Sequence, residues 1–121
     1  MNAKYIKAKI DSMARTPGVA GCAVVEVAAG MVWHAAGTQA DFVAMAEAAS
    51  DYWRLYLRMN MHFTAFGKLT HCTLTHETHQ LMLTLCGHDM VFVTVCDKNY
   101  ALNLSDWNFR IHQLRLILEA E

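Results

Sequence analysis

The sequence predicts an α/β fold in which a five-stranded antiparallel sheet lies between helical layers. Apolar residues recur at helical spacing at both ends of the chain and in its middle, and short apolar or alternating runs that suit strands lie between them. The resulting order is helix, two strands, helix, three strands, helix. With 121 residues, 55% of them hydrophobic, the chain is long enough for one domain with a sizeable core and too short for two.

The first helix is expected from about Ala3 to Arg15, because Ile6, Ile10 and Met13 recur at helical spacing. A Thr-Pro-Gly sequence at residues 16–18 ends it.

Two strands are expected to form a hairpin after this helix. Residues 19–27 are small or β-branched and largely apolar on both faces, which favours a central strand. Residues 31–36 are expected to return beside it after a turn closed by Gly30. Glu26 needs either a buried partner or a place near the exposed strand end, and the nearby turn favours the exposed end.

The longest helix is expected over residues 39–63, which contain no Gly or Pro and are rich in Ala, Met and Leu. Asp41 is placed to cap its start. One stripe of this helix is apolar and carries Phe42, Met45, Ala49, Tyr52, Tyr56, Met59 and Phe63. Trp53, Leu55 and Leu57 fall outside that stripe. A helix this widely apolar needs cover from its own sheet and from a second surface.

Three strands and a helix are expected to complete the chain. Residues 68–76 alternate in polarity, as edge strands often do, and residues 80–86 and 90–96 follow as a meander. The last helix is indicated by the residues Trp107, Ile111, Leu114 and Leu118. Asn99, Asn103 and Ser105 are all suitable N-caps for it, and the sequence does not choose among them.

Composition argues against two kinds of partner. The formal net charge is −1, so the chain lacks the basic excess that a phosphate backbone requires, and we expect no nucleic acid. The longest apolar stretch, residues 19–33, is interrupted by Glu26 and Gly30 and is shorter than the roughly 20 residues needed to span a bilayer. We therefore expect no membrane insertion. The start does not resemble a secretory signal, which indicates a cytoplasmic protein.

Metal or thiol chemistry has weak support. His71, Cys72, His76 and His79 form the densest group of metal-binding residue types, but in a strand His71 and His76 point to opposite faces. Cys72 and His76 share a face yet lie about 13 Å apart along the strand. All four cysteines occur in apolar strand patterns, where a thiol is expected to be reduced and inert. The sequence therefore predicts no catalytic residue, no metal and no cofactor.

The order of elements and residues 16–37, TPGVAGCAVVEVAAGMVWHAAG, resemble the Roadblock/LC7 family. The shared pattern is a Pro-Gly-Val lead into the first strand, a Gly turn, a short second strand and then a long helix. The resemblance covers essentially the whole chain, as a single domain over residues 1–121. It also implies that the last helix opens near Asn99, because residues 98–102 resemble the family's junction after the fifth strand.

The resemblance implies a profilin-like α/β/α sandwich that forms a homodimer by pairing the long helix and the third strand of two copies. It further implies a non-catalytic regulator or scaffold of small Ras-like GTPases. The same two elements are the widely apolar helix and the edge strand, whose surfaces the single chain is expected to leave exposed. The expected dimer-interface residues are Met45, Tyr52, Tyr56 and Met59 of the helix and His71, Thr73 and Thr75 of the strand.

A small-ligand or signal-sensing module is the alternative. On a profilin-like or PAS-like sheet, Trp33, His34, Trp53 and Met61 would line a mainly apolar pocket. A thiol or metal sensor built on His71 and Cys72 is a third hypothesis.

Overall fold

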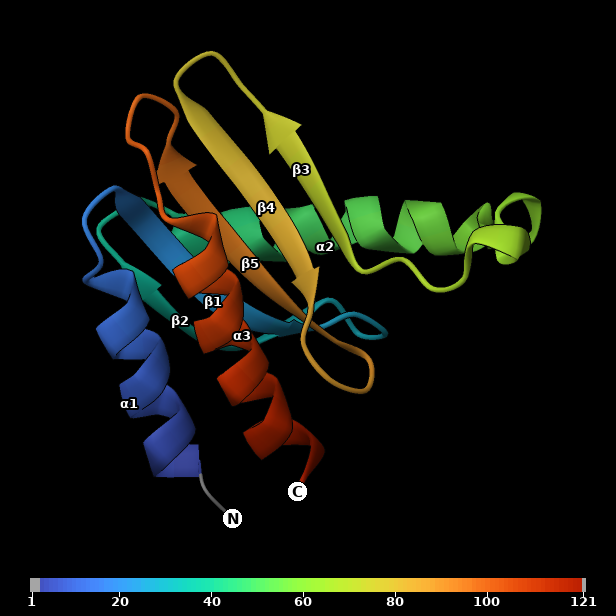
Figure 1. The fold of residues 1–121 in the computed structure, drawn as a ribbon, viewed down its shortest axis with the longest axis horizontal. Coiled ribbons are helices and arrows are strands. Elements are labelled where there is room, and N and C mark those ends of the chain that lie inside the picture. Colours follow the sequence, from blue (N-terminus) through green and yellow to red (C-terminus); the bar gives the residue numbers. More distant parts are fainter. Residues whose placement is uncertain (1–2, 121) are drawn as a thin grey trace.

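The computed structural model describes residues 3–120 as three α-helices and a five-stranded antiparallel sheet, which confirms the predicted fold class and element order (Figure 1). The elements are α1 Ala3–Ala14, β1 Val19–Glu26, β2 Met31–Gly37, α2 Phe42–Arg58, β3 His71–Thr75, β4 His79–Leu85, β5 Met90–Asp97 and α3 Leu104–Glu119. Two 3₁₀ turns, η1 Asn60–His62 and η2 Thr64–Phe66, follow α2.

The strand order across the sheet is β2-β1-β5-β4-β3. β1 is therefore an inner strand, paired with β2 and β5, and the predicted hairpin and meander are both present. β3 pairs with β4 alone, so the prediction of an edge strand is confirmed. Glu26 is exposed at the end of β1, as expected for a charge that no buried partner neutralises.

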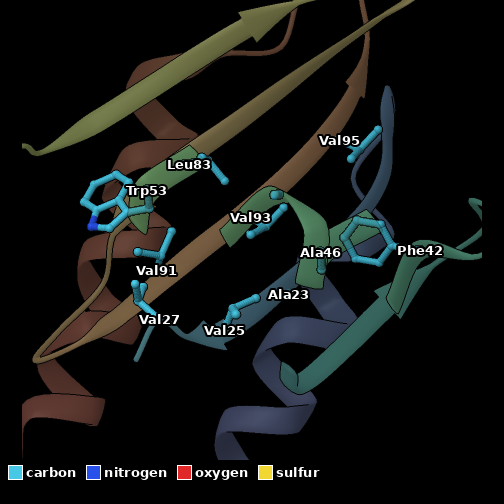
Figure 2. Packing of buried hydrophobic residues seen from close by; sticks show 11 residues of the cluster. Ala23, Val25, Val27, Phe42, Ala46, Trp53, Leu83, Val91, Val93 and Val95 are labelled. Carbon is cyan, nitrogen blue, oxygen red and sulfur yellow. The ribbon is translucent and has the colours of Figure 1, made fainter. Parts of the chain in front are cut away.

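One core lies between α2 and the sheet (Figure 2). The helix contributes Phe42, Ala46, Ala49 and Trp53, and alternate residues of the strands face them. The strand residues in this core include Ala23, Val25, Leu83, Val91, Val93 and Val95. All the buried α2 residues precede Arg54, so the core supports only the first two thirds of the helix.

A second core lies on the opposite face of the sheet, beneath α1 and α3 (Figure 1). α1 buries Ile6, Ile10 and Met13, and α3 buries Trp107, Ile111 and Leu114, at the spacing that predicted both helices. The buried Trp107 indole donates a hydrogen bond to the Thr94 hydroxyl at 3.1 Å. This bond satisfies the indole N–H, which would otherwise be costly to bury.

The β2 edge of the sheet is covered and irregular. α1 packs against β2, and His34 Nε2 lies 2.9 Å from Asp11 Oδ1 of the helix. The pairing of β1 with β2 shifts between Val24 and Val25, which leaves Trp33 as the extra residue of a β-bulge.

α2 is shorter than predicted, because residues 39–41 and 59–63 lie outside it. The N–H groups of Thr38 and Gln39 both donate to the Ala20 carbonyl, which holds this segment against β1 and delays the helix. Asp41 occupies the N-cap position with φ 56°, but its side chain makes no capping hydrogen bond, so that prediction is wrong. At the other end the helix has no core beneath it, and packing no longer favours regular structure.

The start of α3 differs from the start that the family resemblance implies. The helix begins at Leu104, and Asn103 caps it by accepting a hydrogen bond from the Asp106 N–H at 3.0 Å. Asn99 instead takes part in a turn, where its N–H donates to the Asp97 carboxylate. Of the three candidate caps, the structure selects Asn103.

Candidate functional site

The outer face of α2 carries an apolar stripe that nothing in the described chain covers. Met45, Ala48, Tyr52, Leu55 and Met59 follow one another at alternating intervals of three and four residues. The four large side chains of this outer stripe are between 41% and 48% exposed. Intervals of three and four place side chains along one seam of a helix, as in paired helices. A second helix packed along this seam would therefore bury the stripe.

The charges on α2 favour an antiparallel orientation for a second helix packed on the stripe. Glu47 lies in the first half of the helix and Asp51 just past its middle, whereas Arg54 and Arg58 lie closer to its C-terminal end. Tyr52 is the middle residue of the outer stripe, so an antiparallel second copy centred there would bring Glu47 of each copy near Arg58 of the other. A parallel copy would align like charges instead.

Arg54 also fixes the helix to its own sheet. Its Nη1 donates to the Val27 carbonyl at 2.8 Å, and its Nη2 pairs with the Asp51 carboxylate. This anchor at the end of β1 holds α2 in one rotation about its axis. The outer stripe consequently lies on a flank of the helix that does not face the sheet.

The open edge at β3 is the second part of the candidate site. His71, Thr73 and Thr75 are exposed, whereas Cys72 and Leu74 are half-buried on the face that α2 covers. Backbone groups on the outer side of this edge have no strand partner within residues 3–120. Such an edge favours pairing with a strand of another chain.

The structure assigns the expected interface residues to different environments. Met45, Tyr52 and Met59 are exposed on the outer stripe, and His71, Thr73 and Thr75 are exposed on β3. Tyr56 is half-buried, and its ring stacks on Phe63 at 5.5 Å between ring centroids.

The predicted apolar stripe combined two faces of α2. Phe42 and Ala49 of that stripe face the sheet, while Met45, Tyr52 and Met59 face outward. Leu55 and Trp53 both fall outside the predicted stripe. Leu55 belongs to the outer stripe, and Trp53 belongs to the core. The alternation of three and four residues from Met45 to Met59 is the signal that could have identified Leu55.

The four residues of the ligand-module hypothesis do not converge. Trp53 is buried between α2 and the sheet, whereas Trp33 packs on the opposite core. Met61 is 75% exposed, and His34 faces Asp11 of α1. A groove of about 250 Å³ between α3 and the strands β3 and β4 is lined by other residues.

The cysteine thiols differ in accessibility. Cys22, Cys86 and Cys96 are buried, and Cys72 is half-buried; all four are free. Burial raises the pKa of Cys22 and of Cys86 to about 12, and it also raises the pKa of Cys96. Within residues 3–120, no three His, Cys, Asp or Glu side chains are grouped as metal ligands. In the same residues, no helix combines the length and apolar character needed to cross a bilayer.

We expect a thiol reagent at pH 8 to modify Cys72 first in the folded chain when it is diluted to a single copy. A pKa of about 12 keeps Cys22 and Cys86 protonated at this pH, and burial excludes the reagent from them and from Cys96. Stopped-flow absorbance should show one fast thiol per chain, with the other three reacting only after denaturation. A Cys72→Ser chain should lose the fast phase. More than one fast thiol in the folded native chain would contradict the assignment.

Comparison with known proteins agrees with this architecture. The family model described as the Roadblock/LC7 domain matches residues 5–95. A search of curated proteins finds no match.

Several solved structures share the fold at low sequence identity. A Roadblock/LC7 domain from Streptomyces avermitilis is 14% identical with a TM-score of 0.75, covering 96% of this chain and 93% of that one. Myxococcus xanthus MglB is 18% identical with a TM-score of 0.71, again covering 96% and 93%. The gliding protein MglB from Thermus thermophilus is 12% identical with a TM-score of 0.79, covering 100% and 94%. The match of the family model over most of the sequence shows that this chain belongs to the Roadblock/LC7 family.

Proposed function

We propose that this protein is a non-catalytic, homodimeric regulator or scaffold of a small Ras-like GTPase. Membership of the Roadblock/LC7 family supports the GTPase part of this proposal. The observation that carries the homodimer is the uncovered outer stripe of α2 beside the open edge of β3. Exposed apolar surface of this extent and regularity is a mark of protein association.

The dimer pairs equivalent elements around a two-fold axis. The two α2 helices pack antiparallel along their outer stripes, and the two β3 strands pair into one continuous sheet. Met45, Tyr52 and Met59 contribute apolar contacts, and Tyr56 lies at their margin. His71, Thr73 and Thr75 flank the strand pair. Glu47 of each copy lies near Arg58 of the other, which favours this orientation.

The regulation is conformational. A non-catalytic partner acts on a GTPase only by binding one nucleotide state more tightly than the other. The proposal places this interaction in the cytoplasm and requires no cofactor of its own.

The test uses small Ras-like GTPases from the organism that encodes the chain, loaded with fluorescent GDP or a GTP analogue. We expect the native protein to bind one nucleotide state at least about tenfold more tightly and to change hydrolysis or exchange in proportion, since an effector shifts an equilibrium only by its differential affinity. Fluorescence anisotropy and single-turnover hydrolysis measure these quantities. A chain that binds neither state, or both equally, would contradict the regulatory function. Equal binding with retained complex formation would leave the scaffold function.

A further inference from the structure

An exposed aromatic group follows α2. The Phe63 ring stacks on Tyr56 at 5.5 Å and on Phe66 at 6.1 Å between ring centroids. Phe66 is 82% exposed and Met61 is 75% exposed, which is unusual for large apolar side chains in one short segment. We name residues 59–67 the aromatic arm. The arm contains no Asp, Glu, Lys or Arg, although Arg58 and Lys68 border it directly.

The aromatic arm extends past the edge of its own sheet. α2 contacts β2, β1, β5 and β4, and its last buried residue is Trp53. Met59 lies six residues further, about 9 Å along a helix that rises 1.5 Å per residue. Neighbouring strands are about 4.8 Å apart, so this length spans up to about two strand positions. Figure 1 accordingly shows the end of α2 and both 3₁₀ turns beyond β3.

The position beyond β3 is where a second copy would place its own β3. We propose that the aromatic arm of each copy packs on the α2-side face of the partner's sheet and completes the core there. This inference rests on the proposed dimer. Each copy contributes both halves of the contact, as a two-fold interface requires, because the arm and the open edge lie at the same margin of the molecule.

The receiving surface is present on the same face of the sheet. Cys72 is half-buried on the α2 side of β3, and Leu69 and Leu81 are partly buried neighbours of the same core. The described part of α2 leaves these side chains incompletely covered. An uncharged aromatic segment matches this apolar strip, whereas an acidic or basic partner would find no charge on the arm to pair with.

The first test measures the dimer dissociation constant by analytical ultracentrifugation for Phe66→Ser and Met61→Ser. Both side chains are exposed in the single chain, so the variants should fold normally. We expect each to weaken the dimer by roughly 10- to 100-fold, the range typical of an anchoring side chain at an interface. Phe109→Ser is the matched control, because Phe109 is 59% exposed on α3 at the opposite face. It should leave the dissociation constant unchanged.

The second test identifies what the arm touches. A benzophenone amino acid at position 66 is irradiated in a mixture of ¹⁴N- and ¹⁵N-labelled chains. Mixed-isotope cross-links from position 66 to peptides within residues 69–83 support the proposal, and the same probe at position 109 should give none. A dimer with unchanged affinity in both variants and only same-chain cross-links overturns the arm contact alone. A native chain that is monomeric at 100 µM overturns the arm and the dimer together.

Discussion

A Tyr52→Asp chain is expected to be a folded monomer at concentrations where the native chain is a dimer. Tyr52 is the middle residue of the outer stripe, so the two-fold axis of the proposed dimer brings both copies of the residue together. The substitution removes two aromatic contacts and places two carboxylates of like charge in a desolvated seam. Each change disfavours association without touching the core of the single chain.

The expected effect on association is large. Central aromatic residues at interfaces contribute about 2 to 4 kcal/mol when truncated, and burying an unpaired charge adds to that cost. Since about 1.4 kcal/mol changes a dissociation constant tenfold, the dimer should weaken by at least about 10²- to 10³-fold. Light-scattering chromatography across a dilution series gives the solution mass, and circular dichroism verifies that the fold is retained.

Leu116→Asp is the matched control for this change. Leu116 is 57% exposed on α3, on the opposite side of the sheet, and receives the same charge. It should leave the mass of the assembly unchanged. A Tyr52→Asp chain that keeps the native mass would refute the α2 pairing, and equal loss in both variants would point to a general effect of added charge.

Gly37→Ala is expected to destabilise the single chain more than any surface substitution discussed above. Gly37 ends β2 opposite Gly21 of β1, with φ 143°, a conformation that L-residues rarely adopt. A Cβ atom at this position would overlap the Ala20 carbonyl oxygen and the Gly21 Cα. These are backbone atoms of an inner strand, and they cannot move aside as a flexible side chain can.

Two separate costs should add at Gly37. The unfavourable backbone conformation costs about 1 to 3 kcal/mol, and the steric overlap costs about 1 to 3 kcal/mol more. Urea denaturation followed by tryptophan fluorescence should therefore show a loss of about 2 to 6 kcal/mol in the free energy of unfolding. The upper part of this range is exceptional for one substitution and indicates a specific mechanism.

Gly67→Ala separates the two costs. Gly67 also has a positive φ of 82°, but no atom lies within 4 Å of the Cβ that would be added. Only the conformational cost applies there, so the loss should be clearly smaller. Equal losses at the two glycines would show that the overlap with β1 is relieved by movement of the strands.

The sequence predicted the elements of this fold well because burial follows their periods directly. Ile6, Ile10 and Met13 of α1 all lie in the core, and the alternation in residues 68–76 marks a strand at the sheet edge. Glu26 was expected at an exposed strand end, and the turn that follows β1 places it there.

The ends of α2 and the identity of its two apolar faces could not be predicted in the same way. The helix begins late because Thr38 and Gln39 bond to the backbone of a strand that is remote in sequence. It faces the sheet with Phe42, Ala46, Ala49 and Trp53 and presents Met45, Tyr52 and Leu55 to the outside. Both faces are apolar, so hydrophobicity alone does not tell which one is buried. The packing of Phe42 and Trp53 in the core and the hydrogen bond from Arg54 to the Val27 carbonyl together fix the rotation of the helix.

The cap of α3 shows a limit of the family resemblance. The resemblance implied a start near Asn99, but the Asp97 side chain accepts the Asn99 N–H and stabilises a turn there. The helix begins only at Leu104, after the Asn103 cap. Asn and Asp side chains can stabilise either a turn or a helix start, so the residue types alone do not show which of the two forms at a given position.

The contrast between the two margins of the sheet limits how far assembly can proceed. β3 is regular and open, whereas β2 is bent by the bulge at Trp33 and flanked by α1, which the contact between His34 and Asp11 holds in place. Strand addition at both margins would let chains polymerise without end, as in fibres. In the proposed dimer only the β3 edge of each copy is open, and the two-fold axis pairs these two edges with each other, so no further copy would add to the sheet. The bulge therefore disfavours strand addition at the β2 edge and so disfavours aggregation through the sheet.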